Sequence, residues 1–376
     1  FEKIKVEHYL PAFQAAMEEH NKEIQAIIDN AEAPNFDNTI AALDYAGETL
    51  SKVAGVFFNM MAANTSEELQ KVNEQVGPMM ATHSDNISMN AKLFEKIKAV
   101  YDAKDSQKYT GEQLALLEKT YNKFVRSGAL LDAAKQEELR KVNAELTKVE
   151  SKFDANLLKE SKAYQLVIDK EENLKGLPQG EIEKAAALAK EKGKEGKWIF
   201  TLDNPSFMPF VTYADNRDLR KEIFNARVNR CNNGGETDNN ALVAQMSELR
   251  AKKAQLLGYE TFAHYQLEER MAKEPKAVFD LLENLLSYSV KVAKEEAAQF
   301  QAMLSKDVPG AKLEAWDMYY YAEKVRQQKY NFDAELTRPY FEINKVRQGC
   351  FDVLTKLYGI SFTERKGISV YAEDVL

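Results

Sequence analysis

The segment from Asp132 to Ala163 has an apolar side chain at every third or fourth position along most of its length. These positions are Leu139, Val142, Leu146, Val149, Phe153 and Leu157. The spacing puts all six side chains on one face of an α-helix, with lysine, arginine and glutamate between them. We therefore expect a long amphipathic helix that packs against other helices, as in an antiparallel helical hairpin. A coiled coil that binds a partner protein is the alternative, but such a face more often belongs to an intramolecular core.

Helical periodicity also dominates the rest of the chain. Residues 8–29 and 39–61 have the same three- and four-residue spacing, and Thr65 with Glu68 and Thr110 with Gln113 have the spacing of helix-starting capping boxes. Further helices are predicted over 215–230, 238–257, 275–305, 311–331 and 341–357.

The period changes at two short segments. YQLVID at 164–169 and WIFTL at 198–202 are rich in β-branched and aromatic residues, which favours strands. The predicted fold is therefore all-α with a minor β element. We divide the chain into a helical region over 1–160 and a region over 161–376 that contains the strands.

The stretch LDNPSFMPFVTYADNRDLRKEIFNAR at 202–227 interrupts this pattern with two prolines and a cluster of aromatic residues. Pro205 and Pro209 are expected to break the helical periodicity. The aromatic rings would bury a corner between a strand and a helix that begins near Asp215.

Charge and hydropathy exclude some classes of function. The chain has 376 residues and a formal net charge of −8, so general attraction to nucleic acid is not expected. Its apolar runs fall short of the roughly 18 residues that a membrane-spanning helix needs. Its two cysteines form no CxxC motif, which argues against a disulfide framework or a thiolate metal site. A cytoplasmic location is favoured, and a periplasmic or exported one stays open because the chain begins at Phe1 instead of Met.

The residues alone indicate no catalytic group and no metal ligand. The histidines are His8, His20, His83 and His264, and no two are four residues apart, as a helical zinc motif requires. We expect His20 to lie on a helix surface and His264 to have a surface or capping role. Motifs for a serine nucleophile or for a phosphate-binding loop are missing from the sequence.

Several long runs nevertheless resemble one family. LDNPSFMPFVTYADNRDLRKEIFNARVNR at 202–230 and the run from Trp316 to Arg365 are similar to zinc metallopeptidases of the thimet oligopeptidase and oligopeptidase A family. KIKVEHYLPAFQAAMEEHNKEIQAI at 3–27, PNFDNTIAALDYAG at 34–47 and GLPQGEIEKAAALAKEKG at 176–193 also resemble it, and in particular its bacterial peptidyl-dipeptidases. The resemblance covers essentially the whole chain.

This resemblance implies one helical lobe of a clam-shell enzyme whose two lobes face each other across a deep channel. The His-Glu-x-x-His helix of the family has no counterpart before Leu376, so we assign no catalytic and no metal-binding residue to this chain. Zinc would belong to the parent enzyme, and short peptides would be its substrates. The chain would be the N-terminal, non-catalytic portion, inactive by itself, and would pack against a catalytic domain absent from it.

Tyr213 and Arg217 are candidates for the channel wall. The alternative is that Tyr213 packs inside the lobe and that Arg217 pairs with a carboxylate or caps a helix. For the whole chain, the alternative to a peptidase portion is a non-catalytic helical module that binds peptides or serves as a scaffold.

Overall fold

The computed structural model describes residues 3–332, 334–372 and 375, and it forms two compact units. The first unit comprises the chain up to Ala155, then Asn239–Val278, and the residues from Ser369 onward. The second comprises Asn156–Asp238 and Phe279–Ile368. The chain therefore leaves the first unit and returns to it, so neither unit is a single continuous segment.

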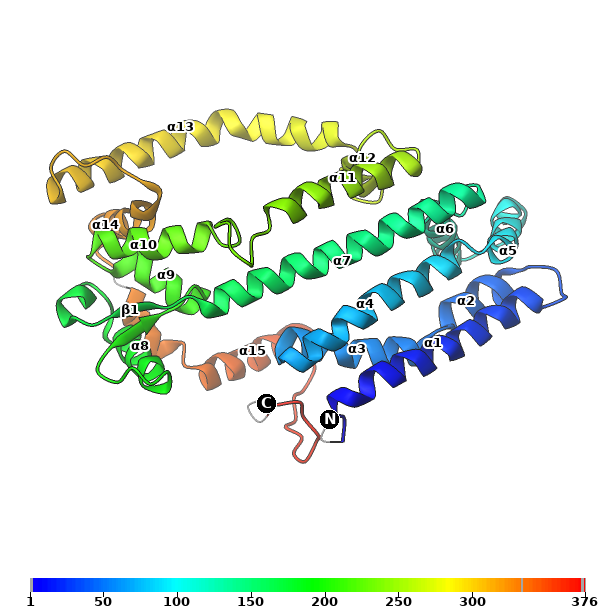
Figure 1. The fold of residues 1–376 in the computed structure, drawn as a ribbon, viewed down its shortest axis with the longest axis horizontal. Coiled ribbons are helices and arrows are strands. Elements are labelled where there is room, and N and C mark those ends of the chain that lie inside the picture. Colours follow the sequence, from blue (N-terminus) through cyan, green and yellow to red (C-terminus); the bar gives the residue numbers. More distant parts are fainter. Residues whose placement is uncertain (1–2, 333, 373–374, 376) are drawn as a thin grey trace. The chain divides into compact units, whose positions relative to one another are not determined.

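The regular secondary structure described for the first unit is all helical. Figure 1 shows α1, α3 and α4, coloured blue to cyan, running side by side, and their contacts agree with this arrangement. Its helices are α1 (Val6–Asp29), a π-helical turn (Phe36–Ala41), α2 (Ala42–Tyr45), α3 (Glu48–Ala63), α4 (Glu67–Ser88), α5 (Ala91–Asp102), a 3-10 turn (Lys104–Ser106), α6 (Gly111–Arg126), the first part of α7 (Ala133–Ala163), α11 (Asn240–Leu256) and α12 (Phe262–Leu267).

Two apolar clusters hold the first unit together. In one, the rings of Tyr9 and Phe13 meet Phe57 edge to face, with centroids 5.1 and 5.4 Å apart. In the other, Ile97 and Leu117 are fully buried where α5 packs on α6. Edge-to-face contacts add to the burial of apolar area, so these clusters fix how the helices of this unit pack.

The long amphipathic helix predicted from the sequence is confirmed as α7. Its predicted positions Leu139, Val142, Leu146 and Val149 are all buried. Side chains from other helices of the first unit bind the same helix: Arg250 of α11 pairs with Glu150 at 2.7 Å, and Lys252 pairs with Glu138 at 2.8 Å. The helix therefore packs intramolecularly, as we expected.

The second unit contains the only two strands of the described residues. Strand β1 (Leu166–Ile168) pairs with β2 (Trp198–Phe200) in antiparallel register, with Val167 opposite Ile199. The other elements are a 3-10 turn (Glu171–Leu174), α8 (Gln179–Glu191), α9 (Asn204–Tyr213), α10 (Arg217–Val228), most of α13 (Pro275–Asp307), a 3-10 turn (Ala315–Asp317), α14 (Met318–Tyr330), a 3-10 segment (Ala334–Tyr340) and α15 (Ile343–Tyr358). The prediction of an all-α chain with a minor β element is confirmed.

One local prediction was wrong. Residues 204–213, which we expected to form an irregular corner, form helix α9. Pro205 lies in the first turn, where its missing N–H has no helical partner to lose, but Pro209 lies inside the helix. An interior proline costs about 3 kcal/mol. Burial of Phe207 and Phe210 contributes about 1.5–3 kcal/mol for each side chain, which offsets the cost of the proline.

The two predicted capping boxes had different outcomes. Thr110 and Gln113 form one at the start of α6, where the Thr110 hydroxyl accepts the Gln113 N–H at 3.2 Å. At the start of α4, however, the cap is Ser66 instead of Thr65, and its hydroxyl accepts from Leu69 N at 3.3 Å. The start of the helix is thus shifted by one residue, because serine is a strong N-cap residue as well.

Candidate functional site

A buried ion-pair cluster organises the part of the second unit that contains Arg217. The carboxylate of Asp317, in the turn before α14, is fully buried. Arg217, the first residue of α10, donates from Nη2 to Asp317 Oδ2 at 2.7 Å and from Nε to Oδ1 at 3.0 Å. The buried Arg220, one turn later, donates from Nη2 to Oδ1 at 3.2 Å. Asp317 therefore receives two guanidinium groups from one face of α10.

Burial alone would raise the pKa of Asp317, because it disfavours the charged form. The hydrogen bonds from Arg217 and from the Glu314 N–H outweigh this effect and lower the pKa. The hydrogen bond with Asp317 also raises the pKa of Arg217. Asp317 and Arg217 are consequently both ionised at neutral pH.

Both residues predicted for a channel wall have contacts within this unit. Tyr213, the last residue of α9, packs against the apolar core that includes Phe210 and Ile223. Arg217 pairs with the carboxylate of Asp317, which agrees with the alternative that this residue pairs with a carboxylate. Their assignment to a channel wall stays a prediction.

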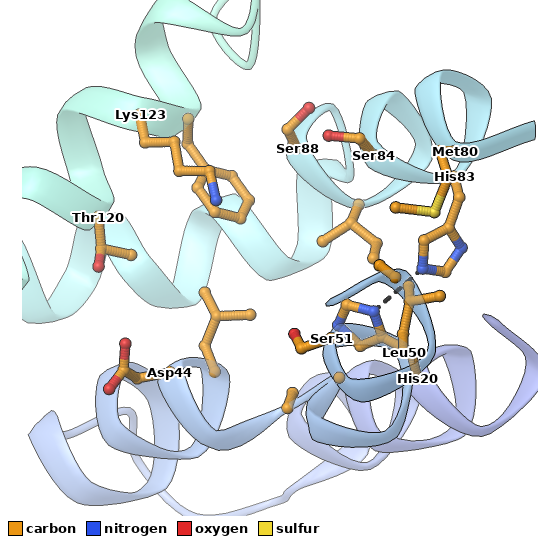
Figure 2. Close-up of a pocket in the computed structure, with 16 residues that line it drawn as sticks. His20, Asp44, Leu50, Ser51, Met80, His83, Ser84, Ser88, Thr120 and Lys123 are labelled. Carbon is orange, nitrogen blue, oxygen red and sulfur yellow. Dashed lines mark hydrogen bonds between the residues drawn. The ribbon is translucent and has the colours of Figure 1, made fainter. Parts of the chain in front are cut away.

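A second candidate site is a pocket of about 390 Å³ in the first unit, between α1, α3, α4 and α6. Figure 2 shows His20 of α1 and His83 of α4 meeting at its edge. His83 Nε2 and His20 Nδ1 are 3.0 Å apart, which is a hydrogen-bond distance. The expectation that His20 is a plain surface residue was therefore wrong, because it is half-buried and paired with a buried histidine.

The surroundings keep both imidazoles neutral. Burial lowers the pKa of His20, while Glu23 opposes this shift and Lys123 adds to it. Burial also lowers the pKa of His83, with a smaller contribution from His20. In a neutral pair one ring can donate and the other accept, whereas two imidazolium rings would both be donors. Gly47 makes the close packing possible, because a Cβ on this residue would lie 2.8 Å from His20 Cε1.

We predict that the free energy of unfolding falls as the pH drops from about 7 to about 5. Because the folded pKa values of His20 and His83 lie below the ordinary value of 6.5, the unfolded chain takes up protons that the folded chain resists. Urea unfolding at several pH values measures the decrease. His83→Gln should make the decrease smaller.

His264→Gln is the matched control for this measurement. His264 is half-buried, and its Nδ1 lies 2.8 Å from the hydroxyl of Thr261, the cap of α12. It takes no part in the contact between His20 and His83, so its substitution should leave the contribution of that pair in place. If His83→Gln and His264→Gln gave the same curves as the unsubstituted protein, the histidine pair would not be the source of the effect.

The grouping of metal-binding side chains bears on both sites. Within the residues that the structure describes, no three or more histidine, cysteine, aspartate or glutamate side chains are grouped so that they could hold a metal ion. The His20 and His83 pair was missed from sequence because 63 residues separate its members. A search for ligands at helical spacing cannot detect such a pair.

Comparison with known proteins shows which proteins the sequence of this chain resembles. Residues 210–376, which include Tyr213, Arg217 and Asp317, match the model of peptidase family M3. The whole chain is 35% identical over 376 residues to a dipeptidyl carboxypeptidase of Escherichia coli and 29% identical over 379 residues to an oligopeptidase A of Salmonella typhimurium.

The chain spans 55% and 56% of the lengths of these two relatives, so it corresponds to only part of each. None of the helices described for it is both long and apolar enough to cross a membrane. The family model and the two alignments agree with one another over the second half of the chain, and the alignments extend through the first half. By these matches residues 210–376 are similar to peptidase family M3, and the whole chain is similar to a dipeptidyl carboxypeptidase and to an oligopeptidase A.

Proposed function

We propose that this chain is the non-catalytic, N-terminal portion of a zinc-dependent oligopeptidase. More specifically, we propose a peptidyl-dipeptidase that releases dipeptides from the carboxyl ends of short peptides. The observation that supports this most strongly is the alignment of the entire chain with a dipeptidyl carboxypeptidase at 35% identity. A cytoplasmic location is part of the proposal, and cell fractionation tests it.

The described residues of this chain do not fit a zinc site. Its described residues contain no suitable group of three metal-binding side chains, and a catalytic zinc takes three protein ligands. The proposal therefore assigns the zinc, and every group that reacts with the peptide, to a catalytic domain of the parent protein outside this chain. The role of this chain is to shape the channel, and Tyr213 and Arg217 are its proposed contributions to the wall.

Exposed apolar side chains in the second unit support packing against such a domain. On α13, Leu281, Leu282, Leu285 and Leu286 are each more than half exposed. On α15, Leu357 is 69% exposed. Exposed apolar side chains gathered on a helix are typical of a surface that another protein part covers.

The test compares the 376-residue chain with the product of the complete gene. We expect the complete protein to release dipeptides from an N-terminally blocked tetrapeptide, and to lose this activity when a chelator removes zinc and regain it when zinc returns. The 376-residue chain should show no activity in the same assay, followed by mass spectrometry of the products. Zinc-dependent cleavage by the purified 376-residue chain would contradict the proposal.

A further inference from the structure

A second pocket of the first unit, of about 290 Å³, is lined by charged side chains of both signs. Its walls come from α4, α6, α7, α11 and α12. The charged residues that line it are Asp85, Arg126, Glu150 and Lys253, so their formal charges cancel.

Two of these four side chains already have an ionic partner. Arg126 forms an ion pair with Glu268, and Glu150 accepts from Arg250 Nη2 at 2.7 Å. The other two, Asp85 and Lys253, form no direct ion pair with any residue that the structure describes. Asp85 and Lys253 nevertheless lie close enough to interact electrostatically across the pocket.

Asn143 occupies the wall beside Asp85. Its Nδ2 donates to both carboxylate oxygens of Asp85, at 3.0 and 3.1 Å. Its Oδ1 is buried and has no hydrogen-bond partner in the described part of the chain. A buried carbonyl oxygen without a partner is unfavourable by about 1–3 kcal/mol. A bound ligand that donates a hydrogen bond to this atom would remove that penalty.

Desolvation acts on both unpaired charges. Burial raises the pKa of Asp85, although the hydrogen bond from Asn143 and the charges of Lys253 and Arg140 oppose the shift. Burial also lowers the pKa of Lys253, although Asp85 and Glu150 oppose it. Each group is thus shifted toward its neutral form, as expected of a charge that has lost water without gaining a direct partner.

We propose that this pocket binds a small zwitterion, namely a free α-amino acid or a dipeptide. Its carboxylate pairs with Lys253, and its ammonium group donates to Asp85 and to Asn143 Oδ1. A ligand of this class satisfies all three groups at once and keeps the pocket electrically neutral.

Other ligand classes satisfy the pocket less well. A simple anion would pair with Lys253 but would leave Asp85 without a cation and Asn143 Oδ1 without a donor. A simple cation would leave Lys253 without an anion. A neutral apolar molecule would desolvate both charges further, which is costly. The volume, close to the lower end of about 300–1,000 Å³ for ligand pockets, also favours a small molecule.

Calorimetric titration of the 376-residue chain with L-alanine and with L-alanyl-L-alanine tests the proposal. We expect saturable one-to-one binding of at least one of them, and the comparison shows whether the site takes an amino acid or a dipeptide. N-acetyl-alanine lacks the ammonium charge and alanine amide lacks the carboxylate, so each should bind at least about tenfold more weakly than alanine. The corresponding blocked dipeptides provide the same comparison for alanyl-alanine.

Lys253→Met and Asp85→Asn should each weaken binding by about tenfold or more. Lys252→Met is the matched control, because Lys252 is the adjacent lysine on α11 but pairs with Glu138 away from the pocket, and it should leave binding unchanged. Circular dichroism confirms that each variant is folded.

The proposal fails if neither zwitterion saturates the protein at about 10 mM, since Asp85 and Lys253 would then be bridged by water alone. It also fails if the blocked analogues or Lys253→Met bind as well as their parents. The titration needs no turnover, so its outcome is independent of the proposed peptidase function.

Discussion

Asp317→Ala is expected to lower the free energy of unfolding by about 3–5 kcal/mol. Asp317 has no exposed surface, and Arg220 beside it is only 1% exposed. Without the carboxylate, the Arg220 guanidinium stays buried, and its remaining acceptors among the described residues are the carbonyl oxygens of Ala214 and Asp215. A buried charge that has lost its counter-ion is strongly destabilising, and urea unfolding followed by circular dichroism measures the loss.

Asp307→Ala is the matched control in the same unit. Its carboxylate accepts from the Lys324 ammonium and from the Tyr321 hydroxyl, both at 3.2 Å, and its side chain is 43% exposed. Since partly exposed ion pairs contribute about 0–1 kcal/mol, this substitution should have a much smaller effect. Equal losses in the two variants would show that burial of the Asp317 cluster does not determine its contribution.

The helices could be predicted because the sequence patterns that identify a helix involve residues close together in the chain. The buried positions Leu139, Val142, Leu146 and Val149 follow the helical period, and this period alone predicted α7. The two strands, at 166–168 and 198–200, were likewise found from β-branched and aromatic residues. Where two local signals compete, however, the outcome depends on tertiary packing: Pro209 argued against a helix, and burial of Phe207 and Phe210 decided for one.

The candidate sites could not be predicted because their residues are distant in sequence. Arg217 and Asp317 are 100 residues apart, and Asp85 and Asn143 are 58 apart. No spacing rule links such positions, and only the fold brings them together. Tyr213 and Arg217 were proposed for a channel wall because they lie in the unusual segment 202–227, and nothing in the sequence indicated the contact between Arg217 and Asp317.

The resemblance to the family was nevertheless evident from the sequence. Long ordered runs such as Trp316–Arg365 identify ancestry without requiring that any residue in them be catalytic. In this chain the run contains Asp317, whose contacts hold α10 in place. The runs that identify the family therefore contain residues that build the lobe, and this agrees with the proposal that the chemistry lies elsewhere in the parent protein.

Gly176→Ala is the second substitution with a large expected effect. Gly176 has a φ of +90°, a conformation that residues with a Cβ rarely adopt. A Cβ on it would overlap the carbonyl oxygen of Tyr213 and would lie 2.7 Å from Asp215 Oδ1. The backbone here cannot easily move away, because the Asp215 N–H donates to Lys175 O at 2.8 Å.

Two unfavourable contributions combine at this position. The left-handed conformation costs about 1–2 kcal/mol for a residue with a Cβ. Steric overlap in a packed region adds about 1–3 kcal/mol. We therefore expect Gly176→Ala to lower the free energy of unfolding by about 2–5 kcal/mol, measured by urea unfolding.

Gly349→Ala, in the same unit, is expected to change the free energy of unfolding in the opposite direction. Gly349 lies inside α15, and an added Cβ would meet no atom within 4 Å. Alanine there should raise the free energy of unfolding by about 0.5–1 kcal/mol, because glycine loses more backbone entropy in a helix. The same chemical change would thus act with opposite sign at the two positions. If Gly176→Ala were as well tolerated as Gly349→Ala, the tight approach between residues 175–176 and 213–215 would not be what positions the start of α10 and, with it, Arg217.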